Sequence, residues 1–298
     1  MAQSPGLLAG VLESPDDDAA RLVYADWLME QRDPRGEFIS LQCALARRSL
    51  DPQRREEYRA RALALLAQHE DAWAAGAATA EARFFRRGFI DEVRGKTKKL
   101  LPGLEDLFEL EPIRRLALTD LAKEAARKLA AAPFLARVTH LTIQGSFGDD
   151  GIAALARSPH LTRVVSLNLG PKIGPRGAAA LAASPHIARV VTLSLTSNVL
   201  GDAGAVALAR APLSACKALH LSRNEIGDEG VTALAGSEHL GNLTRLSLNF
   251  NEEISDKGAL ALAKSPHLTG LRHLEIVGTE IGKTGGKALR KRFGRVVD

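Results

Sequence analysis

Aromatic residues make up only 4% of this 298-residue chain, although hydrophobic residues reach 45%. Enzymes that bind small molecules usually line a concave pocket with aromatic side chains, so the composition argues against such a pocket. Leu and Ala supply most of the apolar content, which suits the thin, regular layers of a repeat protein. We therefore expect a binding protein with no enzymatic activity and no cofactor.

Cysteine is nearly absent, with only Cys43 and Cys216 in the chain. Two cysteines can form neither a disulfide framework nor a four-cysteine zinc site, so we expect reduced thiols in a reducing compartment. The short apolar stretch Leu7–Leu12 has no basic segment before it and makes a poor signal peptide. No apolar run approaches the roughly 18 residues of a membrane span. These absences predict a cytoplasmic protein.

Neither charge sign dominates the chain. The formal net charge is +5, and basic residues gather at Arg83–Arg87, Lys96–Lys99 and Lys283–Arg295. Such clusters either hold an anionic partner or form a solvated face. Because few aromatic side chains are present to stack on bases, we do not expect nucleic acid as the partner. Nucleic-acid binding through Lys283–Arg295 remains an alternative, which a steep salt dependence would reveal.

The chain repeats itself from residue 116 onward. Seven units open with an L-x-L or L-x-I pair, and the steps between them are 25, 26, 26, 26, 27 and 28 residues. The first leucines of the units are Leu116, Leu141, Leu167, Leu193, Leu219, Leu246 and Leu274. Alternation with period two predicts a short strand with one buried face at each of these positions.

Each strand is followed by a turn, a helix and a stop. In the clearest unit the turn is Asn224–Gly230 and the apolar helix is Val231–Ala235. An Asp or Ser after the turn glycine, such as Asp202 or Ser255, is expected to cap the helix that follows it. Proline in the Ser265–His267 type of stop then prevents the helix from continuing.

Stacking these units predicts an α/β solenoid, a horseshoe with a parallel sheet on its concave face and helices outside. Asn198, Asn224 and Asn251 lie where a side-chain ladder can satisfy backbone groups of the next coil. The first three units carry Leu121, Ser146 and Lys172 there, so we expect an irregular ladder at that end.

The pattern LxLxxNxIGDxGxxALA resembles the ribonuclease-inhibitor class of leucine-rich repeats, and the resemblance covers about residues 106–293. Seven copies agree in phase. The resemblance implies a horseshoe fold of about seven units over residues 106–298, and such repeats generally bind other proteins.

Residues 1–82 do not repeat, and they predict a small all-α module. Ser14 reads as the cap of a helix that runs through Leu28, with Pro15 at its first position. Asp33–Gly36 predicts a turn. Further helices are expected over Glu37–Arg48 and Pro52–Trp73.

Asp17–Leu28 with Asp33–Gln42 resembles the bacterial repeat-companion domain, which is found beside leucine-rich repeats, and Phe85–Ile90 is similar to that family's junction segment. The resemblance implies architecture and no activity. Residues 83–105 are then a junction and degenerate first coil, with a strand at Phe89–Val93 and a helix over Leu101–Leu110. We expect the helical module to cover the exposed apolar end of the solenoid.

Three sequence features resemble motifs that carry chemistry in other proteins. Gly278–Thr284 resembles a phosphate-binding loop but is one residue too short. Asp16–Asp18 fans around a helix axis and does not converge on a metal. One histidine recurs near the helix end of several units, which favours an interaction with the helix dipole over metal binding; these are His160, His186, His239 and His267.

The positions flanking each repeated leucine should point to the concave face. Most are small and polar, as on a surface that binds a protein. The predicted partner-binding residues are His140, Gln144, Asn168, Ser194, Thr196, His220, Arg223, Arg245, Asn249, Phe250, His273 and Glu275. Arg223 and Phe250 occupy equivalent positions in adjacent units, and an exposed Arg beside an exposed aromatic is typical of binding hot spots. The alternative is a phenylalanine folded back onto its turn.

We thus expect a monomeric interaction scaffold or adaptor with an unidentified protein partner. An alternative is an activating protein of a small GTPase, since some repeats of this class have that role. Such a protein usually supplies a charged residue to the catalytic centre, and the arginines at or beside the concave face are Arg115, Arg223 and Arg245.

Overall fold

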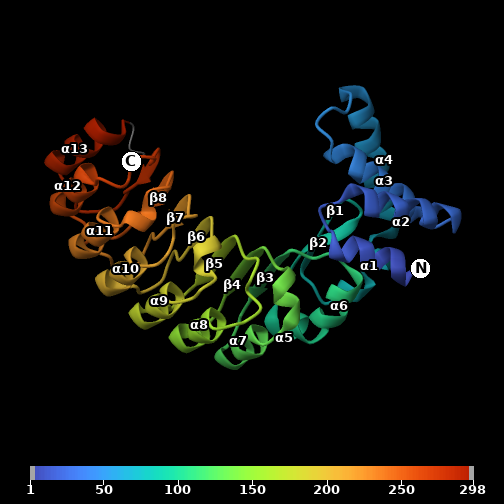
Figure 1. The fold of residues 1–298 in the computed structure, drawn as a ribbon, viewed down its shortest axis with the longest axis horizontal. Helices are drawn as coiled ribbons and strands as arrows, with labels where there is room; N and C mark the ends of the chain where they lie inside the picture. Colours follow the sequence, from blue (N-terminus) through green and yellow to red (C-terminus); the bar gives the residue numbers. More distant parts are fainter. Residues whose placement is uncertain (1–3, 295–298) are drawn as a thin grey trace. The chain divides into compact units, whose positions relative to one another are not determined.

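The computed structural model describes residues 4–294, and the chain divides into two compact units. Unit 1 is Met1–Ala117 and unit 2 is Leu118–Asp298. Strand β3 (Arg115–Thr119) contributes residues to both. Figure 1 shows helices throughout unit 1 and alternating strands and helices in unit 2.

Unit 1 is mainly helical. Its helices and strands are α1 (Pro5–Glu13), α2 (Asp18–Glu30), α3 (Pro34–Ala46), α4 (Pro52–Trp73), the 3-10 helix Ala75–Ala77, β1 (Ala82–Arg86), β2 (Phe89–Lys96), α5 (Thr97–Leu100), the 3-10 helix Leu101–Gly103 and α6 (Leu104–Leu110). Asp17, Asp33 and Asp51 cap α2, α3 and α4, each accepting a hydrogen bond from the backbone N–H two residues on. An aspartate at this position satisfies one of the free N–H groups of the first turn.

Several predictions for unit 1 were wrong in detail. Asp17, not Ser14, caps α2, and helix α1 precedes it. The predicted turn Asp33–Gly36 is instead the start of α3, because Asp33 caps the helix and Pro34 occupies its first position. Helix Pro52–Trp73 is confirmed. The segment Phe85–Ile90 lies in an antiparallel hairpin of β1 and β2, whose first strand was not predicted.

A buried ion pair and an aromatic ring organise the core of unit 1. The Arg35 guanidinium lies 2.6 Å from the Glu111 carboxylate, and both side chains are largely buried. Glu111 also accepts a hydrogen bond from the backbone N–H of Ile90. The guanidinium carbons of Arg21 and Arg35 lie 5.0 and 4.8 Å from the centre of the Phe89 ring. Cations over an aromatic face are attracted by the ring quadrupole.

Unit 2 alternates strand and helix. After β3 its strands are β4 (His140–Gln144), β5 (Ser166–Gly170), β6 (Thr192–Ser194), β7 (Ala218–His220), β8 (Arg245–Ser247) and β9 (His273–Glu275). Its helices are α7 (Lys123–Ala130), α8 (Gly148–Ala156), α9 (Pro175–Ala182), α10 (Gly201–Ala209), α11 (Asp228–Ala235), α12 (Asp256–Lys264) and α13 (Lys283–Phe293). Short 3-10 turns occur at Pro133–Arg137, Ile187–Arg189 and Glu238–Leu240.

The predicted solenoid is confirmed in unit 2. Strands β4 to β9 pair in chain order, every pairing is parallel, and the repeated leucines face one another in register from Leu141 to Leu274. These leucines are buried, so the strands share one continuous core. The strands line the inner side of the unit and the helices its outer side (Figure 1).

The asparagine ladder is also confirmed, but it bonds to the preceding coil and not to the next one. The Asn251 Oδ1 atom accepts hydrogen bonds from the backbone N–H groups of Asn224 and Ile226, and its Nδ2 donates to the carbonyls of Leu221 and Leu248. Asn224 donates in the same way to the Leu195 carbonyl of the preceding coil. Both side chains are fully buried, so they satisfy backbone groups that water does not reach.

The sequence predicted that the aspartate after the turn glycine caps its own helix, and this was wrong. Asp202, at the start of α10, accepts hydrogen bonds from the backbone N–H groups of Gly227 and Gly230, at the start of α11. Asp149, Asp228 and Asp256 bond to the following coil in the same way. These four aspartates therefore cap the next helix, whereas Ser255 caps its own helix α12.

This carboxylate requires a glycine in the facing helix. A Cβ atom on Gly230 would lie 2.6 Å from the Asp202 Oδ1 atom, and the same approach recurs at Gly258 and Gly285. The repeated Gly-Asp-x-Gly spacing thus reflects a contact between neighbouring coils.

Candidate binding surface

The twelve predicted partner-binding residues all lie in unit 2, within its strands or at most three residues beyond a strand end. We call these positions the strand face. Seven of the twelve are exposed: Gln144, Asn168, Thr196, Arg223, Arg245, Phe250 and His273. The other five are half-buried: His140, Ser194, His220, Asn249 and Glu275. The side chains are mostly polar, as predicted.

Arg223 and Phe250 form one stacked pair on this face. The Arg223 guanidinium carbon lies 4.0 Å from the centre of the Phe250 ring. Hydrogen bonds from the Arg223 N–H to the Asn249 carbonyl, and from the Phe250 N–H to the Val277 carbonyl, place the two turns side by side. Both residues have a positive φ, near 58° and 57°, so the two turns have the same conformation.

The stacked pair is exposed rather than folded away. Phe250 keeps 43% of its surface accessible, one of the larger values among the hydrophobic residues of unit 2. Its ring edge lies against Gly278, where a Cβ atom would come within 2.7 Å of Cδ1. The ring is therefore held by a glycine on one side and a guanidinium on its face, which fixes its orientation without burying it.

An open hollow of about 370 Å³ adjoins this pair. It is lined by Asn198, Arg223, Glu225, Phe250, Glu252 and Glu253. The sequence prediction missed the three glutamates, although they follow the strands in the same turns as Arg223 and Phe250. The hollow thus combines one cation, one apolar ring and three carboxylates.

A polar network occupies the neighbouring strands. Asn249 donates from Nδ2 to the Glu275 carboxylate at 3.3 Å and accepts the Val277 N–H through Oδ1 at 2.7 Å. Burial lowers the pKa of His220, with a further lowering by Arg245 and an opposing effect of Glu275. His220 therefore presents a neutral imidazole near neutral pH.

Sequence motifs that suggested chemistry have structural roles. The loop-like segment Gly278–Thr284 is the turn into α13, and the N–H groups of Gly282 and Gly285 both bond to Asp256. A carboxylate thus occupies the donors that a phosphate would need. The His186 Nε2 atom lies 3.0 Å from the Ser158 carbonyl, within the backbone of the preceding coil.

Over residues 4–294 we find no group of three His, Cys, Asp or Glu side chains arranged to hold a metal ion. Cys43 and Cys216 are buried and not disulfide-bonded, and burial raises the pKa of each thiol to about 11. Such thiols are poor nucleophiles. Within the same residues, no helix has the length and apolar character that crossing a membrane requires.

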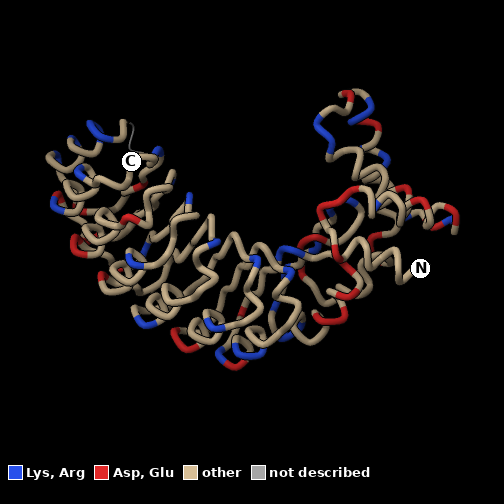
Figure 2. Tube along the Cα trace, viewed as in Figure 1, with Lys and Arg blue, Asp and Glu red and all other residues tan. Residues whose placement is uncertain are grey.

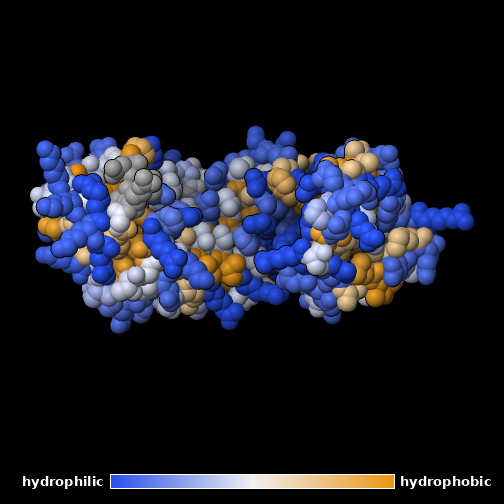
Figure 3. All heavy atoms as spheres, turned by 90° about the horizontal axis from the view of Figure 1, so that it is seen from above, coloured by the Kyte–Doolittle hydropathy of each residue, from blue (hydrophilic) through white to orange (hydrophobic). Residues whose placement is uncertain are grey.

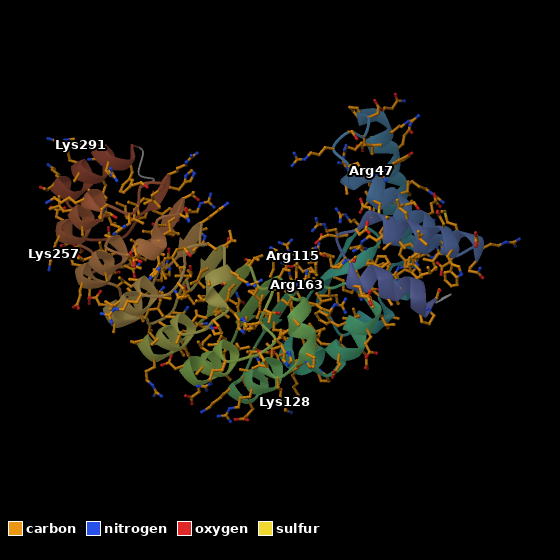
Figure 4. The ribbon with its side chains drawn as sticks, in the orientation of Figure 1. Arg47, Arg115, Lys128, Arg163, Lys257 and Lys291 are labelled. Atoms are coloured by element: carbon orange, nitrogen blue, oxygen red, sulfur yellow. The ribbon has the colours of Figure 1, made fainter. Side chains whose placement is uncertain are left out.

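Exposed polar and basic side chains occur on both layers of unit 2. Figure 3, which views the molecule from above Figure 1, shows mainly hydrophilic colours with small hydrophobic patches between them. In Figure 4, Lys128 and Lys257 lie on the outer, helical side of unit 2, whereas Arg163 lies toward its strands. In unit 1, Arg115 belongs to the predicted concave set, but its Nε atom is 3.7 Å from the Glu92 carboxylate.

A family model described as Leucine Rich repeat matches residues 190–209, 217–235, 239–263 and 267–289. No curated protein matches the chain. A chain in the crystal structure of the Rad7 and Elc1 complex from yeast is similar at 13% identity, over 68% of this chain and 71% of that chain, with a TM-score of 0.29. The four matched stretches cover the last four coils of unit 2.

Proposed function

We propose that this leucine-rich-repeat protein is a non-enzymatic scaffold or adaptor that binds a protein partner on the strand face of unit 2. Leucine-rich repeats generally mediate protein–protein interaction. The observation that carries the proposal for this chain is the exposed Arg223–Phe250 stack.

The stack has the properties of an interface anchor. Arg and aromatic side chains dominate binding energy at protein interfaces when a partner excludes water from them. A guanidinium over a ring is attracted by roughly 0.5–1 kcal/mol while exposed and by about 2 kcal/mol or more when desolvated. A partner that covers Phe250 therefore strengthens a contact that already orients the ring.

The surroundings of the stack suit a protein better than a small molecule. The hollow beside it is open and polar, with Glu225, Glu252 and Glu253 along its wall. Small-molecule sites are usually enclosed and mostly apolar. A polar rim around one apolar anchor is typical of protein interfaces.

The GTPase-activating alternative depends on a free arginine. Arg115 is paired with Glu92 and Arg223 is stacked on Phe250. Arg245, which is exposed on β8, is the candidate that remains for this role. A GTP-hydrolysis assay with candidate GTPases tests it, because loss of stimulation in Arg245→Ala alone would mark an inserted arginine.

We also propose that residues 1–82 are a bacterial repeat-companion module, with residues 83–105 as its junction to the solenoid at 106–298. We further propose that this module caps the solenoid. We also propose that the protein is cytoplasmic and monomeric. Light scattering of the purified chain measures its oligomeric state directly. Part of the alternative nucleic-acid segment, Arg295, lies outside the described residues.

The test is an affinity pull-down from the native cytosol with mass spectrometry. Wild type is compared with a strand-face variant in which His220, Arg223, Arg245 and Phe250 are Ala. A control variant carries four alanines on the helices of unit 2, at Lys128, Arg176, Glu229 and Lys287, all exposed. The proposal predicts a protein that wild type and the control recover and the strand-face variant loses. Equal recovery by all three would contradict it.

A further inference from the structure

The segments that lead from each helix of unit 2 into the next strand are strongly basic. Residues 131–140, 157–166, 183–192, 210–218, 236–245 and 264–273 contain nine Lys and Arg residues but a single acid, Glu238. Six of these cations lie at the first residue of a strand or within three residues before it, and Arg137 is the half-buried one among them. The other five are exposed, and we call them the basic rim: Arg163, Arg189, Lys217, Arg245 and Arg272.

The basic rim is a continuous row, with one cation in each of five consecutive coils. Backbone hydrogen bonds link the coils at this level, from Lys217 N–H to the Val191 carbonyl and from Arg272 N–H to the Thr244 carbonyl, at 2.8 and 3.0 Å. The N–H groups of Thr244 and Arg245 both donate to the Lys217 carbonyl. Neighbouring coils are therefore about 5 Å apart at this level, and the rim cations differ by up to three residues in their position relative to the strand. Blue positions recur from coil to coil along the strand layer of unit 2 (Figure 2).

None of the five side chains is neutralised by the chain itself. All five are exposed, and among residues 4–294 none has a carboxylate within 4.0 Å. Like charges in neighbouring coils repel one another, and an anion that reaches the row reduces this repulsion.

The opposite edge of the sheet has the reverse composition. The turns that follow the strands of unit 2, together with the first turns of its helices, carry most of its acids, including Glu225, Glu252 and Glu253 beside the hollow. Several of these acids have a structural use, since Asp202 and Asp228 cap the helix of the next coil. The rim cations have no comparable use among the described residues.

We propose that the basic rim binds an acidic segment of the partner polypeptide, laid across the entrances of strands β5 to β9. This deepens the proposed function, because it names the chemistry of the partner, and it rests on that function for the identity of the bound molecule as a protein. Arg245 belongs both to the rim and to the strand face, so one partner can contact both surfaces. Arginine pairs with carboxylates through two parallel hydrogen bonds, and three further rim residues, Arg163, Arg189 and Arg272, are arginines.

The rim fits an acidic polypeptide better than a nucleic acid. An extended peptide with an acid at every second residue places one charge about every 7 Å, somewhat wider than the roughly 5 Å between neighbouring coils. A DNA duplex carries one charge per roughly 1.7 Å, far more than one cation per coil can neutralise. The rim segments contain one aromatic residue, Phe134, and it is buried, so no ring is available to stack on an unpaired base.

The test is a titration of the full-length chain with a fluorescent peptide of about sixteen residues in which Glu alternates with Ser. The rim variant is Arg163→Glu, Lys217→Glu and Arg272→Glu. A matched control, Lys128→Glu, Arg176→Glu and Lys287→Glu, makes the same charge change on exposed positions of α7, α9 and α13. We expect the rim variant to bind at least about tenfold more weakly and the control to stay within about twofold of wild type.

Equal weakening in both variants, or equal binding of a neutral peptide with Gln in place of Glu, would overturn the proposal. Tighter rim-dependent binding of oligothymidine than of the acidic peptide would assign the rim to nucleic acid and also overturn it. If the Glu substitutions unfold the chain, Gln at the same three positions replaces them, with an expected loss of about threefold. None of the three residues belongs to the strand-face variant, so failure here and failure of the proposed function give different results.

Discussion

The two units of this chain use their charged residues in different ways. Unit 1 contains 18 Lys and Arg against 20 Asp and Glu, whereas unit 2 contains 22 against 15. Of the 13 ion-pair contacts between described residues, 11 lie within unit 1. Unit 1 therefore pairs about half of its arginines with its own carboxylates, and unit 2 leaves most of its cations exposed.

The difference follows from how each unit satisfies its backbone. The coils of unit 2 are joined by strand ladders, buried asparagines and aspartate caps, none of which needs a cation. Unit 1 has no such repeat, and its core is fixed by contacts that are particular to one place, such as Arg35 with Glu111. A charge removed from unit 1 should thus reduce stability, and a cation removed from unit 2 should reduce binding.

The largest effect is expected for Glu111→Ala in unit 1. The substitution leaves the buried Arg35 guanidinium and the Ile90 N–H without their partner, which costs roughly 3–5 kcal/mol of unfolding free energy. Urea unfolding measures the loss. Glu37→Ala is the matched control, because its partner Arg61 is exposed and the pair contributes less than about 1 kcal/mol. Similar losses of unfolding free energy in the two variants would show that the buried pair stabilises the protein no more than the exposed pair does.

A smaller loss is expected for Asn224→Ala in unit 2. The buried amide donates to the carbonyls of Leu195 and Ser222, which lose that partner in the variant, at a cost of roughly 2–3 kcal/mol. Asn242→Ala removes an exposed amide that donates to Ser214, and it should cost less than about 1 kcal/mol. Thermal unfolding followed by circular dichroism compares the two variants. An equal decrease in Tm for both would contradict a stabilising role of the asparagine ladder.

The aspartate caps should contribute less again. Asp202→Ala frees the N–H groups of Gly227 and Gly230 at the start of the next helix, and we expect a loss of about 1–2 kcal/mol. Amide hydrogen exchange should then speed up in α11 more than in α10, the helix that carries the aspartate. Faster exchange confined to α10 would restore the assignment made from the sequence.

The smallest effect is the pH dependence of one cap. Burial alone would raise the pKa of Asp228, but hydrogen bonds from Ser255 and Gly258 lower it below its usual value. Because the pKa of Asp228 is lower in the folded state, its ionised carboxylate stabilises the fold at pH values above the unfolded-state pKa near 3.8. That stabilisation is lost as the pH falls through the folded-state pKa. The stability difference between wild type and Asp228→Asn should therefore shrink below about pH 4. A constant difference down to pH 2 would contradict this assignment.

The sequence predicted the solenoid well because each coil repeats the same physical solution. Alternation around Leu141 or Leu219 marks a strand wherever it occurs, and seven copies in phase leave little freedom for another fold. The strand-face residues followed from the same alternation. The stacking of Arg223 on Phe250 could be suspected from their equivalent positions, but not the ring's exposure, which depends on Gly278 in the next coil.

The missed features depend on contacts between coils or between distant residues. Asp202 precedes its own helix directly in the sequence, so the capping rule chose that helix, whereas its carboxylate reaches the next one. In unit 1, Ser14 and Pro15 look like a helix start, yet Asp17 supplies the cap three residues later. The basic rim was missed because its five cations drift by up to three positions relative to the repeated leucine.

One paired measurement tests the central claim that unit 1 uses its charges for folding and unit 2 for binding. Arg35→Gln and Arg223→Gln remove one guanidinium from each unit, and both proteins are assayed for urea unfolding and for recovery of the protein partner. The account predicts that Arg35→Gln lowers the unfolding midpoint, while Arg223→Gln keeps the wild-type midpoint and recovers less partner. A destabilised Arg223→Gln that still recovers the partner fully would contradict it.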